Sequence, residues 1–437
     1  MTDDKPGLPP PIVRRSDEDL KRVRVTRSYE VITPLFGGGA EPQKADEVTV
    51  VRGSEVRAQL RFWWRAMRGG RFGGDLAKMK AHEDEIWGTA ARPDLPQAPT
   101  ARTGQTADRA ACENPKRPPA VQLALTITNA GRPMTVTAKS GRRKGQQVNI
   151  GDPESPYSYV AFALREKQGK VIEGVKFDLN LTYAKAHADD VEAAIWGWET
   201  FGGIGARTRR GFGALACTNV SGALPATPES VEAWIFGQAQ KYRATGKWHD
   251  SVPHPLYGQI RRVPQPFDDP MKAWVYLFSA LREFRQYRID KHTGKYSPYG
   301  RSVWPEPREI RRLASVKGGK VRGVPAAGKF PRAVFGMPIL FQFKDEPIGP
   351  ATLKPSSHDR LASPLILRPL KCANGACVAL AVRLKTPELP PGSHLELDGH
   401  PVASQLSAAD ATAIPPLDTQ TDVLGAFLAW LVKGKDR

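Results

Sequence analysis

Residues 51–68 read VRGSEVRAQLRFWWRAMR, and this stretch decides the expected fold. Its apolar residues recur every three or four positions, which is the spacing of a buried face on an α-helix. Ser54 stands where its hydroxyl could cap the start of that helix. The buried face, within a sector of roughly 60°, consists of Val56, Leu60, Trp63 and Met67. The sequence therefore predicts a helix within residues 52–68 that packs on a sheet.

Four arginines share a second face of the same helix. They lie in a neighbouring sector of roughly 80°, with Trp64 between the two faces: Arg57, Arg61, Arg65 and Arg68. Cations four residues apart repel each other, and no acidic residue lies on this face, so an anion should compensate the charge. Nucleic acid or acidic side chains from elsewhere in the fold could supply that anion, or the arginines could stay solvated. The spacing leaves these alternatives open.

A second basic segment, residues 202–213, reads GGIGARTRRGFG. Glycines such as Gly203 and Gly205 let main-chain N–H groups approach phosphate oxygens, and Arg207, Arg209 and Arg210 supply charged donors. The segment lacks the Gly-Lys-Ser/Thr ending of a nucleotide-hydrolysing loop. We interpret it as a phosphate cradle, with a flexible turn and exposed arginines as the alternative.

Both segments, together with TPLFGGG at residues 33–39, resemble the signatures of the RAMP superfamily, the RNA-binding proteins of CRISPR systems. More narrowly, they are similar to the first-named subunit of type III-B (Cmr) complexes. Short blocks at residues 304–306, 335–339 and 360–365 extend the similarity over roughly residues 25–385. The chain departs from the pattern at Glu55 and Ala58, where the family has Ser and Gly. Glu55 places a negative charge near the expected RNA path.

The resemblance implies an α+β fold with two tandem ferredoxin-like (RRM-like) RAMP domains. The first domain should span residues 21–220, after a flexible N-terminus at 1–20 and with a surface insertion at about 89–119. A second, divergent domain should span residues 230–437. The expected order in the first domain is strand, helix, strands, helix, strand, which fits a ferredoxin-like unit. In the second half we expect helices near 231–242, 271–287, 305–313 and 422–431, and strands near 338–343, 364–370 and 378–384.

Composition points to a polyanionic partner. Lys and Arg number 64 against 45 Asp and Glu, a net charge of +19 in 437 residues, and the length favours two cores. No apolar run approaches the roughly 18 residues of a membrane span, and residues 1–11 lack the apolar core of a signal peptide. We expect a cytoplasmic protein with no membrane partner. The four cysteines are interpreted as structural.

The sequence offers no convincing catalytic site. A metal-free ribonuclease needs histidines beside a cation, yet none lies in residues 48–70 or 202–213. His249 and His254 bracket Asp250 in a proline-rich segment that reads as an interdomain loop. His82 and the acids that follow it lack further metal ligands. We therefore predict no catalytic residue, metal or cofactor.

The resemblance thus implies a non-catalytic RNA-binding subunit of a type III-B CRISPR effector complex. It should cap the backbone near the 3′ end of the guide RNA, help bind single-stranded target RNA in antiviral defence, and contact other RAMP subunits. The alternatives are a RAMP-type endoribonuclease that processes precursor CRISPR RNA and a generic basic scaffold. The predicted RNA-binding residues are Arg52, Ser54, Arg57, Arg61, Trp64, Arg65, Arg68, Arg142, Arg143, Gly203, Gly205, Arg207, Arg209, Arg210, Arg360 and Arg368. Replacing Arg57 and Arg61 with alanine should weaken RNA binding and leave the melting curve nearly unmoved.

Overall fold

The structure describes most of the chain. In this computed structural model the described residues are 21–37, 49–89, 119–165, 171–314, 328–343 and 346–433. The N-terminus predicted to be flexible, residues 1–20, lies outside them. The predicted insertion at about 89–119 also lies outside them, apart from its first and last residues.

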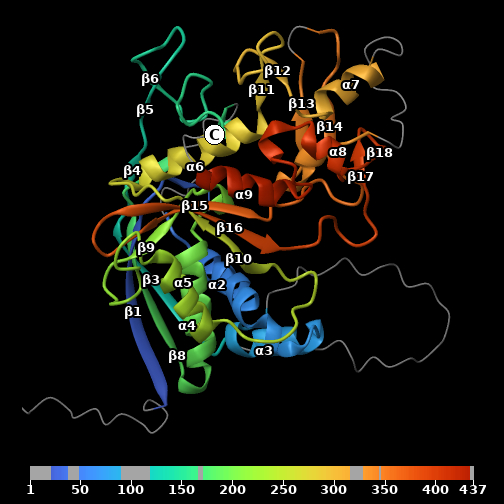
Figure 1. Cartoon of the computed structure of the whole chain (residues 1–437). Helices are drawn as coiled ribbons and strands as arrows, with labels where there is room; N and C mark the ends of the chain where they lie inside the picture. The colour runs from blue at the N-terminus through green and yellow to red at the C-terminus, as the bar shows by residue number, and fades with distance from the viewer. Residues whose placement is uncertain are drawn as a thin grey trace, which may run out of the picture.

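A four-stranded antiparallel sheet forms the outer layer of the N-terminal half (Figure 1). In spatial order its strands are β3 (Gln122–Asn129), β8 (Lys176–Ala184), β1 (Arg22–Val31) and β9 (Leu215–Cys217). One face of this sheet is covered by helices α2 (Gly53–Arg68) and α4 (Ala188–Phe201). Along the chain the order is strand, helix, strand, strand, helix, strand, as predicted for a ferredoxin-like unit.

Apolar and polar side chains alternate along β8, and this pattern determines which face of the sheet the helices cover. Phe177, Leu179 and Leu181 are buried against the helices, and the residues between them face outward. The outward face of β1, β3 and β8 carries polar residues such as Arg24 and Thr26 and no aromatic side chain. RRM domains stack RNA bases on aromatic residues of this face. These strands therefore do not provide that mode of RNA binding.

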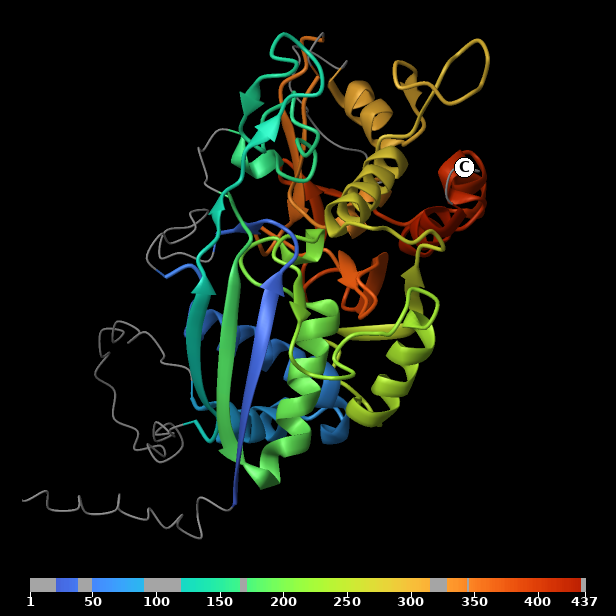
Figure 2. The same cartoon turned by 90° about the vertical axis from the view of Figure 1, so that its left-hand side faces the viewer.

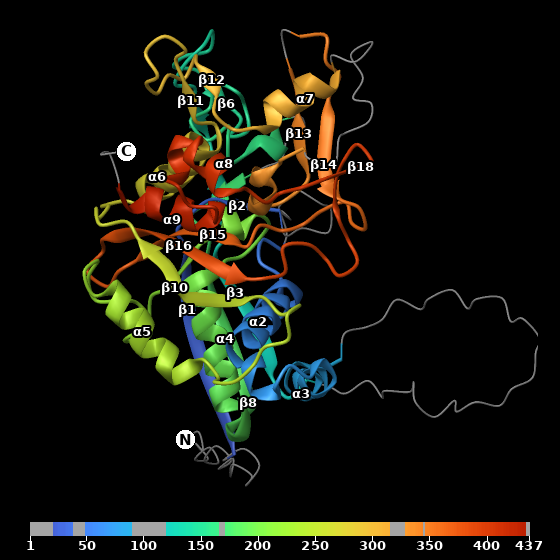
Figure 3. The same ribbon diagram turned by 45° about the vertical axis from the view of Figure 1, so that its right-hand side comes forward.

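A second sheet packs on the opposite side of α2 and α4 (Figure 3). Its described strands, in spatial order, are β10 (His254–Arg262), β16 (Cys377–Lys385) and β15 (Leu365–Lys371). Helices α6 (Pro270–Arg285) and α9 (Val423–Lys433) cover the other face of this second sheet. The molecule thus has the layers sheet, helices, sheet, helices.

The α2 and α4 layer shares one hydrophobic core with both sheets. Leu370 and Leu380 of the second sheet are buried in the same cluster as Trp63 of α2 and Phe177 of β8. Another cluster fills the space between the second sheet and helices α6 and α9. The two cores expected from the length therefore do not coincide with the two halves of the chain.

The second half repeats most of the chain order of the first. β10, α6, β15, β16 and α9 follow one another as strand, helix, strand, strand, helix, and within the described residues no fourth strand pairs with this sheet. A small sheet and two helices add to this unit: β13 (Ile339–Phe341), β14 (Ala351–Pro355), β17 (Leu395–Leu397), β18 (His400–Val402), α7 (Glu306–Ala314) and α8 (Ala408–Thr412).

Some elements differ from the sequence predictions. Helix α5, Val231–Tyr242, has the predicted bounds but packs on α4 of the first half. Helix α3 (Leu76–Trp87) was not predicted, and β10 begins in a segment that was expected to be an interdomain loop. Within the part of the chain that the structure describes, no helix is both long and apolar enough to cross a membrane.

Two hairpins project from the same end of the molecule (Figures 1 and 2). The first pairs β5 (Val136–Thr137) with β6 (Gln147–Val148), and the predicted RNA-binding residues Arg142 and Arg143 lie between these strands. The second pairs β11 (Arg288–Ile289) with β12 (Arg301–Ser302) directly after α6. A further short sheet joins β2 (Leu35–Phe36), β7 (Val171–Glu173) and β4 (Arg132–Pro133).

Candidate RNA interface

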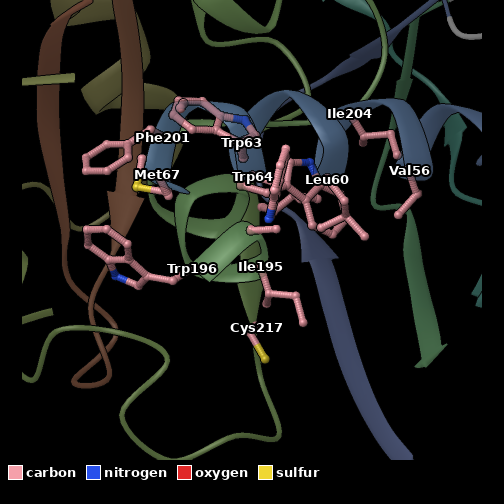
Figure 4. Close-up of a cluster of buried hydrophobic side chains, with 14 of the residues drawn as sticks. Val56, Leu60, Trp63, Trp64, Met67, Ile195, Trp196, Phe201, Ile204 and Cys217 are labelled. Carbon is pink, nitrogen blue, oxygen red and sulfur yellow. The ribbon is translucent and has the colours of Figure 1, made fainter. Parts of the chain in front are cut away.

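The apolar face of α2 is buried as predicted. Figure 4 shows its side chains packed against α4, and Val56, Leu60, Trp63 and Met67 are all at most 2% exposed. Gly197 of α4 permits this close packing, because a Cβ there would lie 3.1 Å from Cγ of Met67 and 3.2 Å from Cε3 of Trp63. Helix α2 is therefore anchored by its apolar side chains, independently of any ligand.

The N-terminus of α2 differs from the prediction. The helix begins at Gly53 with Arg52 as its N-cap residue, and no side chain caps it. Ser54 is exposed and makes no capping hydrogen bond. The predicted serine cap is wrong because the helix starts two residues earlier than a helix capped by Ser54 would start.

Trp64 lies inside the fold. Its side chain is fully buried, and its indole Nε1 donates a hydrogen bond of 2.9 Å to Oδ1 of Asp190 on α4. A buried ring with its donor satisfied offers no face to an RNA base, so the predicted RNA contact at Trp64 is corrected to a core position.

The four arginines on the second face of α2, Arg57, Arg61, Arg65 and Arg68, form an arginine stripe. Carboxylates of α3 neutralise the two arginines at its centre. Arg61 donates from Nε to Oε1 of Glu83 at 2.7 Å, and Arg65 donates from Nη1 to the same oxygen at 2.6 Å. Asp84 lies 3.3 Å from Nη2 of Arg61. Glu83 is only 1% exposed, so two arginines share one buried carboxylate. The compensating anion left open by the sequence is therefore, for this pair, an acidic side chain from elsewhere in the fold.

The arginines at the two ends of the stripe, Arg57 and Arg68, also have hydrogen-bond partners within the protein. Arg57 donates from Nη1 to the carbonyl oxygens of Trp87 and Val121, at 3.4 and 3.1 Å. Burial, together with the nearby charge of Arg61, lowers the pKa of Arg57. Arg68 donates to Asp190 at 3.3 Å. The whole stripe thus holds α3 and α4 against α2, and we now expect loss of stability when Arg57 and Arg61 are replaced.

The glycine-rich segment uses its N–H groups within the protein. Ile204 donates to the carbonyl of Gly213 at 2.9 Å, and Ala206 donates to that of Phe36 at 2.6 Å. A Cβ on Gly203 would lie 2.7 Å from the Gly213 carbonyl oxygen. Gly205 has φ +83°, and a Cβ there would lie 2.7 Å from the Phe36 carbonyl oxygen. These glycines serve close backbone packing, so the predicted phosphate cradle is not available at these N–H groups.

Glu55, one of the two departures from the family pattern, joins α2 to this segment. Its carboxylate accepts a hydrogen bond from the N–H of Gly205. Burial raises the pKa of Glu55, while the Gly205 N–H and the charge of Arg52 act in the opposite direction. The carboxylate therefore occupies the N–H group that a phosphate would otherwise meet.

Arg209 and Arg210 connect the two halves of the chain. Arg209 donates to the carbonyl of Ser363 at 2.5 Å, and Arg210 donates to that of Phe335 at 2.7 Å. Burial, with a smaller contribution from the charge of Arg285, lowers the pKa of Arg210 to about 10. Both predicted RNA contacts are thus positioned as links between the halves.

Arg368 was predicted to be an exposed phosphate contact at the end of a strand, and the structure contradicts this. Its side chain is fully buried on β15. The guanidinium donates to the carbonyl oxygens of Glu199 at 2.7 Å, Gly202 at 2.8 Å and Leu215 at 2.9 Å. Burial lowers its pKa to about 9. Arg368 thus donates to two carbonyl oxygens at the C-terminus of α4, where the helix has no following turn to donate to them.

Arg207 and Arg360 are predicted residues, one from each half of the chain, that remain exposed and whose charges interact. Both are exposed, and Arg207 donates from Nη1 to the carbonyl of Val160 at 3.1 Å. Burial of its guanidinium and the charge of Arg360 both lower the pKa of Arg207. Neither arginine forms an ion pair with a residue that the structure describes. Two like charges from opposite halves therefore interact without a protein counterion.

Comparison with known proteins supports the family resemblance. Residues 28–216 match the model of the RAMP superfamily. This region, a little under half of the chain, is similar to the RAMP superfamily. The chain is also similar to the CRISPR system Cmr subunit Cmr1-2 of Pyrococcus furiosus, with 25% identity over 197 residues that cover 43% of this chain and 90% of that protein. The predicted resemblance to the first-named Cmr subunit is therefore confirmed.

Two solved structures are also similar to this chain. One is the apo crystal structure of Cmr1 from Pyrococcus furiosus, with a TM-score of 0.47, 14% identity, and coverage of 84% of this chain and 90% of that one. The other is a chain of the type III-B Cmr-beta complex bound to cognate target RNA, with a TM-score of 0.46, 12% identity, and coverage of 94% and 100%.

The β5–β6 hairpin carries two of the predicted RNA-binding residues, Arg142 and Arg143. Arg143 is paired with Asp152, at 2.5 Å from Nη2 to Oδ2, and its Nε lies 3.6 Å from Glu154. Arg142 is exposed and has no ion pair with any residue of the described ranges. Arg142 is thus the better RNA candidate of the two.

Two histidines that lie beyond α2 in the sequence, His82 and His187, lie close to it in the fold. The His82 ring stacks on Trp64 with centroids 5.9 Å apart, and the His187 ring lies 6.4 Å from that of His82. His254, in contrast, is buried and stacked on Trp248, and its Nδ1 pairs with the Val252 carbonyl. Among the described residues, no group of three or more His, Cys, Asp or Glu side chains could hold a metal ion.

Proposed function

We propose that this protein is a non-catalytic, RNA-binding subunit of a type III-B CRISPR effector complex. In that role it binds the backbone near the 3′ end of the guide RNA, helps to engage single-stranded target RNA, and contacts other RAMP subunits. The family match, the similarity to a Cmr subunit and the net charge of +19 support this proposal. We further infer that the second half is a ferredoxin-like unit that lacks its last strand.

The observation that carries the proposal is the interaction between the charges of Arg207 and Arg360. The two exposed arginines repel each other, and neither is ion-paired with a carboxylate of the described residues, so a bound anion would stabilise both. A phosphodiester matches this site because one phosphate can accept hydrogen bonds from two guanidiniums. A chain of phosphates along the junction of the two halves would neutralise the pair.

Replacing both Arg207 and Arg360 with alanine is expected to weaken binding of single-stranded RNA about tenfold or more at moderate salt. Removing one arginine–phosphate interaction lowers the slope of log affinity against log salt concentration by about 0.7 for single strands, so removing two lowers it by about 1.4. Fluorescence anisotropy of a labelled oligonucleotide at several salt concentrations measures both quantities.

A matched control removes two arginines that already have protein counterions. Arg132 pairs with Glu173 at 3.0 Å and Arg311 pairs with Glu346 at 2.8 Å, and both are exposed. The double alanine variant at these positions changes the net charge equally but should keep the RNA affinity within about twofold and the salt slope unchanged. Equal reductions of affinity in the two double variants would contradict a specific site at Arg207 and Arg360.

The endoribonuclease alternative is favoured by one observation, the pair His82 and His187 beside α2. Carboxylates flank this pair: Glu85 lies 3.5 Å and Asp190 lies 3.6 Å from nitrogen atoms of His82. Such negative neighbours disfavour a phosphate in the site. We expect no discrete product when the protein is incubated with precursor repeat RNA in EDTA. A product that disappears when either histidine is replaced with alanine would establish the nuclease instead.

A further inference from the structure

The β11–β12 hairpin displays an aromatic ring to solvent. Tyr299 is 96% exposed and makes no ring contact with a residue that the structure describes, and Tyr296 beside it is 51% exposed. Burial of a tyrosine ring normally stabilises a fold substantially. An exposed ring such as that of Tyr299 does not contribute this stabilisation. The sequence alone did not indicate a role for this segment.

The turn that carries Tyr299 is built to hold the ring outward. The N–H of Gly300 donates to the Ser297 carbonyl at 3.0 Å, and the N–H of Tyr299 donates to the Ser297 hydroxyl at 3.3 Å. A Cβ on Gly300 would lie 2.1 Å from the carbonyl oxygen of Ile289, so only glycine permits the turn to pack on β11. The exposure of Tyr299 is therefore a property of an ordered turn.

The stem of the hairpin is fixed to the helices beneath it. The Tyr287 ring lies 5.2 Å from that of Tyr296 and 5.6 Å from that of Trp430 on α9. Val303 donates to the Tyr287 carbonyl at 3.2 Å, which closes the base of the hairpin. These contacts set the position of Tyr299 relative to the rest of the protein.

The hairpin that carries Tyr299 also carries cations without counterions among the described residues. The exposed basic residues of the hairpin make no ion pair with any carboxylate in the described part of the chain: Arg288, Lys291, Lys295 and Arg301. The one acidic residue, Asp290, uses its carboxylate within the hairpin and accepts the N–H groups of His292 and Thr293, both at 2.9 Å. The hairpin thus combines an accessible aromatic face with uncompensated positive charge.

We propose that residues 288–301 form a stacking site for an unpaired base of a single-stranded RNA. Tyr299 provides the platform, and the cations of the hairpin contact the phosphates on either side, which is the combination that single-strand binding proteins use. A protein partner fits less well, because lysines are depleted at protein interfaces and Tyr287 is turned into the stem. The inference rests on the proposed function in taking RNA as the ligand.

Replacing Tyr299 with alanine tests this site. The probe is a single-stranded oligouridine that contains one 2-aminopurine, whose fluorescence reports stacking. We expect the affinity of Tyr299→Ala to fall about tenfold and the fluorescence change on binding to shrink, whereas Tyr299→Phe stays within about twofold of wild type because it keeps the ring. Phe236→Ala is the control, since Phe236 is also exposed, at 62%, but lies on α5.

The outcomes separate this inference from the proposed function. Unchanged affinity of Tyr299→Ala, with weaker binding by the Arg207 and Arg360 double variant, would overturn the hairpin site and leave the proposed function standing. A wild-type protein that binds no RNA would overturn both. An equal reduction of affinity for a fully paired duplex would exclude base stacking. Dissociation of a protein subunit of the complex, with RNA affinity intact, would overturn the inference in favour of protein docking.

Discussion

Replacing Arg368 with methionine is expected to lower the free energy of unfolding by about 4 kcal/mol. Methionine can fill the space of the side chain but cannot donate, so the carbonyl oxygens of Glu199, Gly202 and Leu215 would lose their donor in the interior. Each buried acceptor left without a partner costs about 1–3 kcal/mol. Because these groups link β15 to the end of α4, the destabilisation falls on the junction of the two halves.

Thermal and denaturant unfolding measure this effect against a matched variant. Arg311→Met removes an arginine that is half-exposed and paired with Glu346, and it should change the free energy of unfolding by less than about 1 kcal/mol. If Arg368→Met and Arg311→Met unfold at the same denaturant concentration, the buried guanidinium does not hold the two halves together.

The second large effect concerns the arginine stripe. Replacing Arg61 with alanine should lower the free energy of unfolding by about 3 kcal/mol, because Glu83 is buried and loses one of its two cationic partners. RNA affinity, measured well below the melting temperature, should stay within about twofold of wild type. Both quantities come from the same protein preparation, by denaturant unfolding and by anisotropy.

Lys78→Ala is the control for this second prediction. Lys78 lies on α3 but is exposed and pairs at 3.4 Å with Asp75, which is itself partly exposed, so its replacement should hardly change the stability. A lower RNA affinity of Arg61→Ala with an unmoved unfolding curve would instead identify α2 as the RNA-binding helix.

The structure explains why the sequence predicted α2 well and its function poorly. Periodicity within 16 residues is local information, and it located both the apolar face and the basic face. The acids that neutralise the basic face are not local. Glu83 lies 22 residues after Arg61 on a helix that was not predicted, and Asp190 lies 122 residues after Arg68. Sequence spacing cannot show such partners.

A signal for α3 was present and was missed. Asp75 caps that helix through a hydrogen bond from the N–H of Lys78 at 3.0 Å, and Met79 and Ile86 are buried on one side. Asp before a run with helical spacing is a recognisable start signal. Recognising α3 would have placed Glu83 near the arginine stripe as a candidate counterion.

Arg368 and the glycine-rich segment show two further limits of predicting function from the sequence. Arg368 is the only charged residue in LILRPL, residues 365–370. Its apolar neighbours on both sides are typical of a strand buried on both faces, and they could have indicated that Arg368 is buried as well. Glycines that approach a phosphate and glycines that approach a neighbouring backbone look alike in a sequence. Gly203 and Gly205 proved to be of the second kind, and only the fold could distinguish the two.

RNA binding at Arg207 and Arg360 is tested most directly by a structure of the protein bound to single-stranded guide-type RNA. We expect a phosphate within hydrogen-bond distance of both guanidiniums, with Arg61 and Arg65 still paired to Glu83. A phosphate on the stripe of α2, with Glu83 displaced and the junction of Arg207 and Arg360 empty, would contradict it.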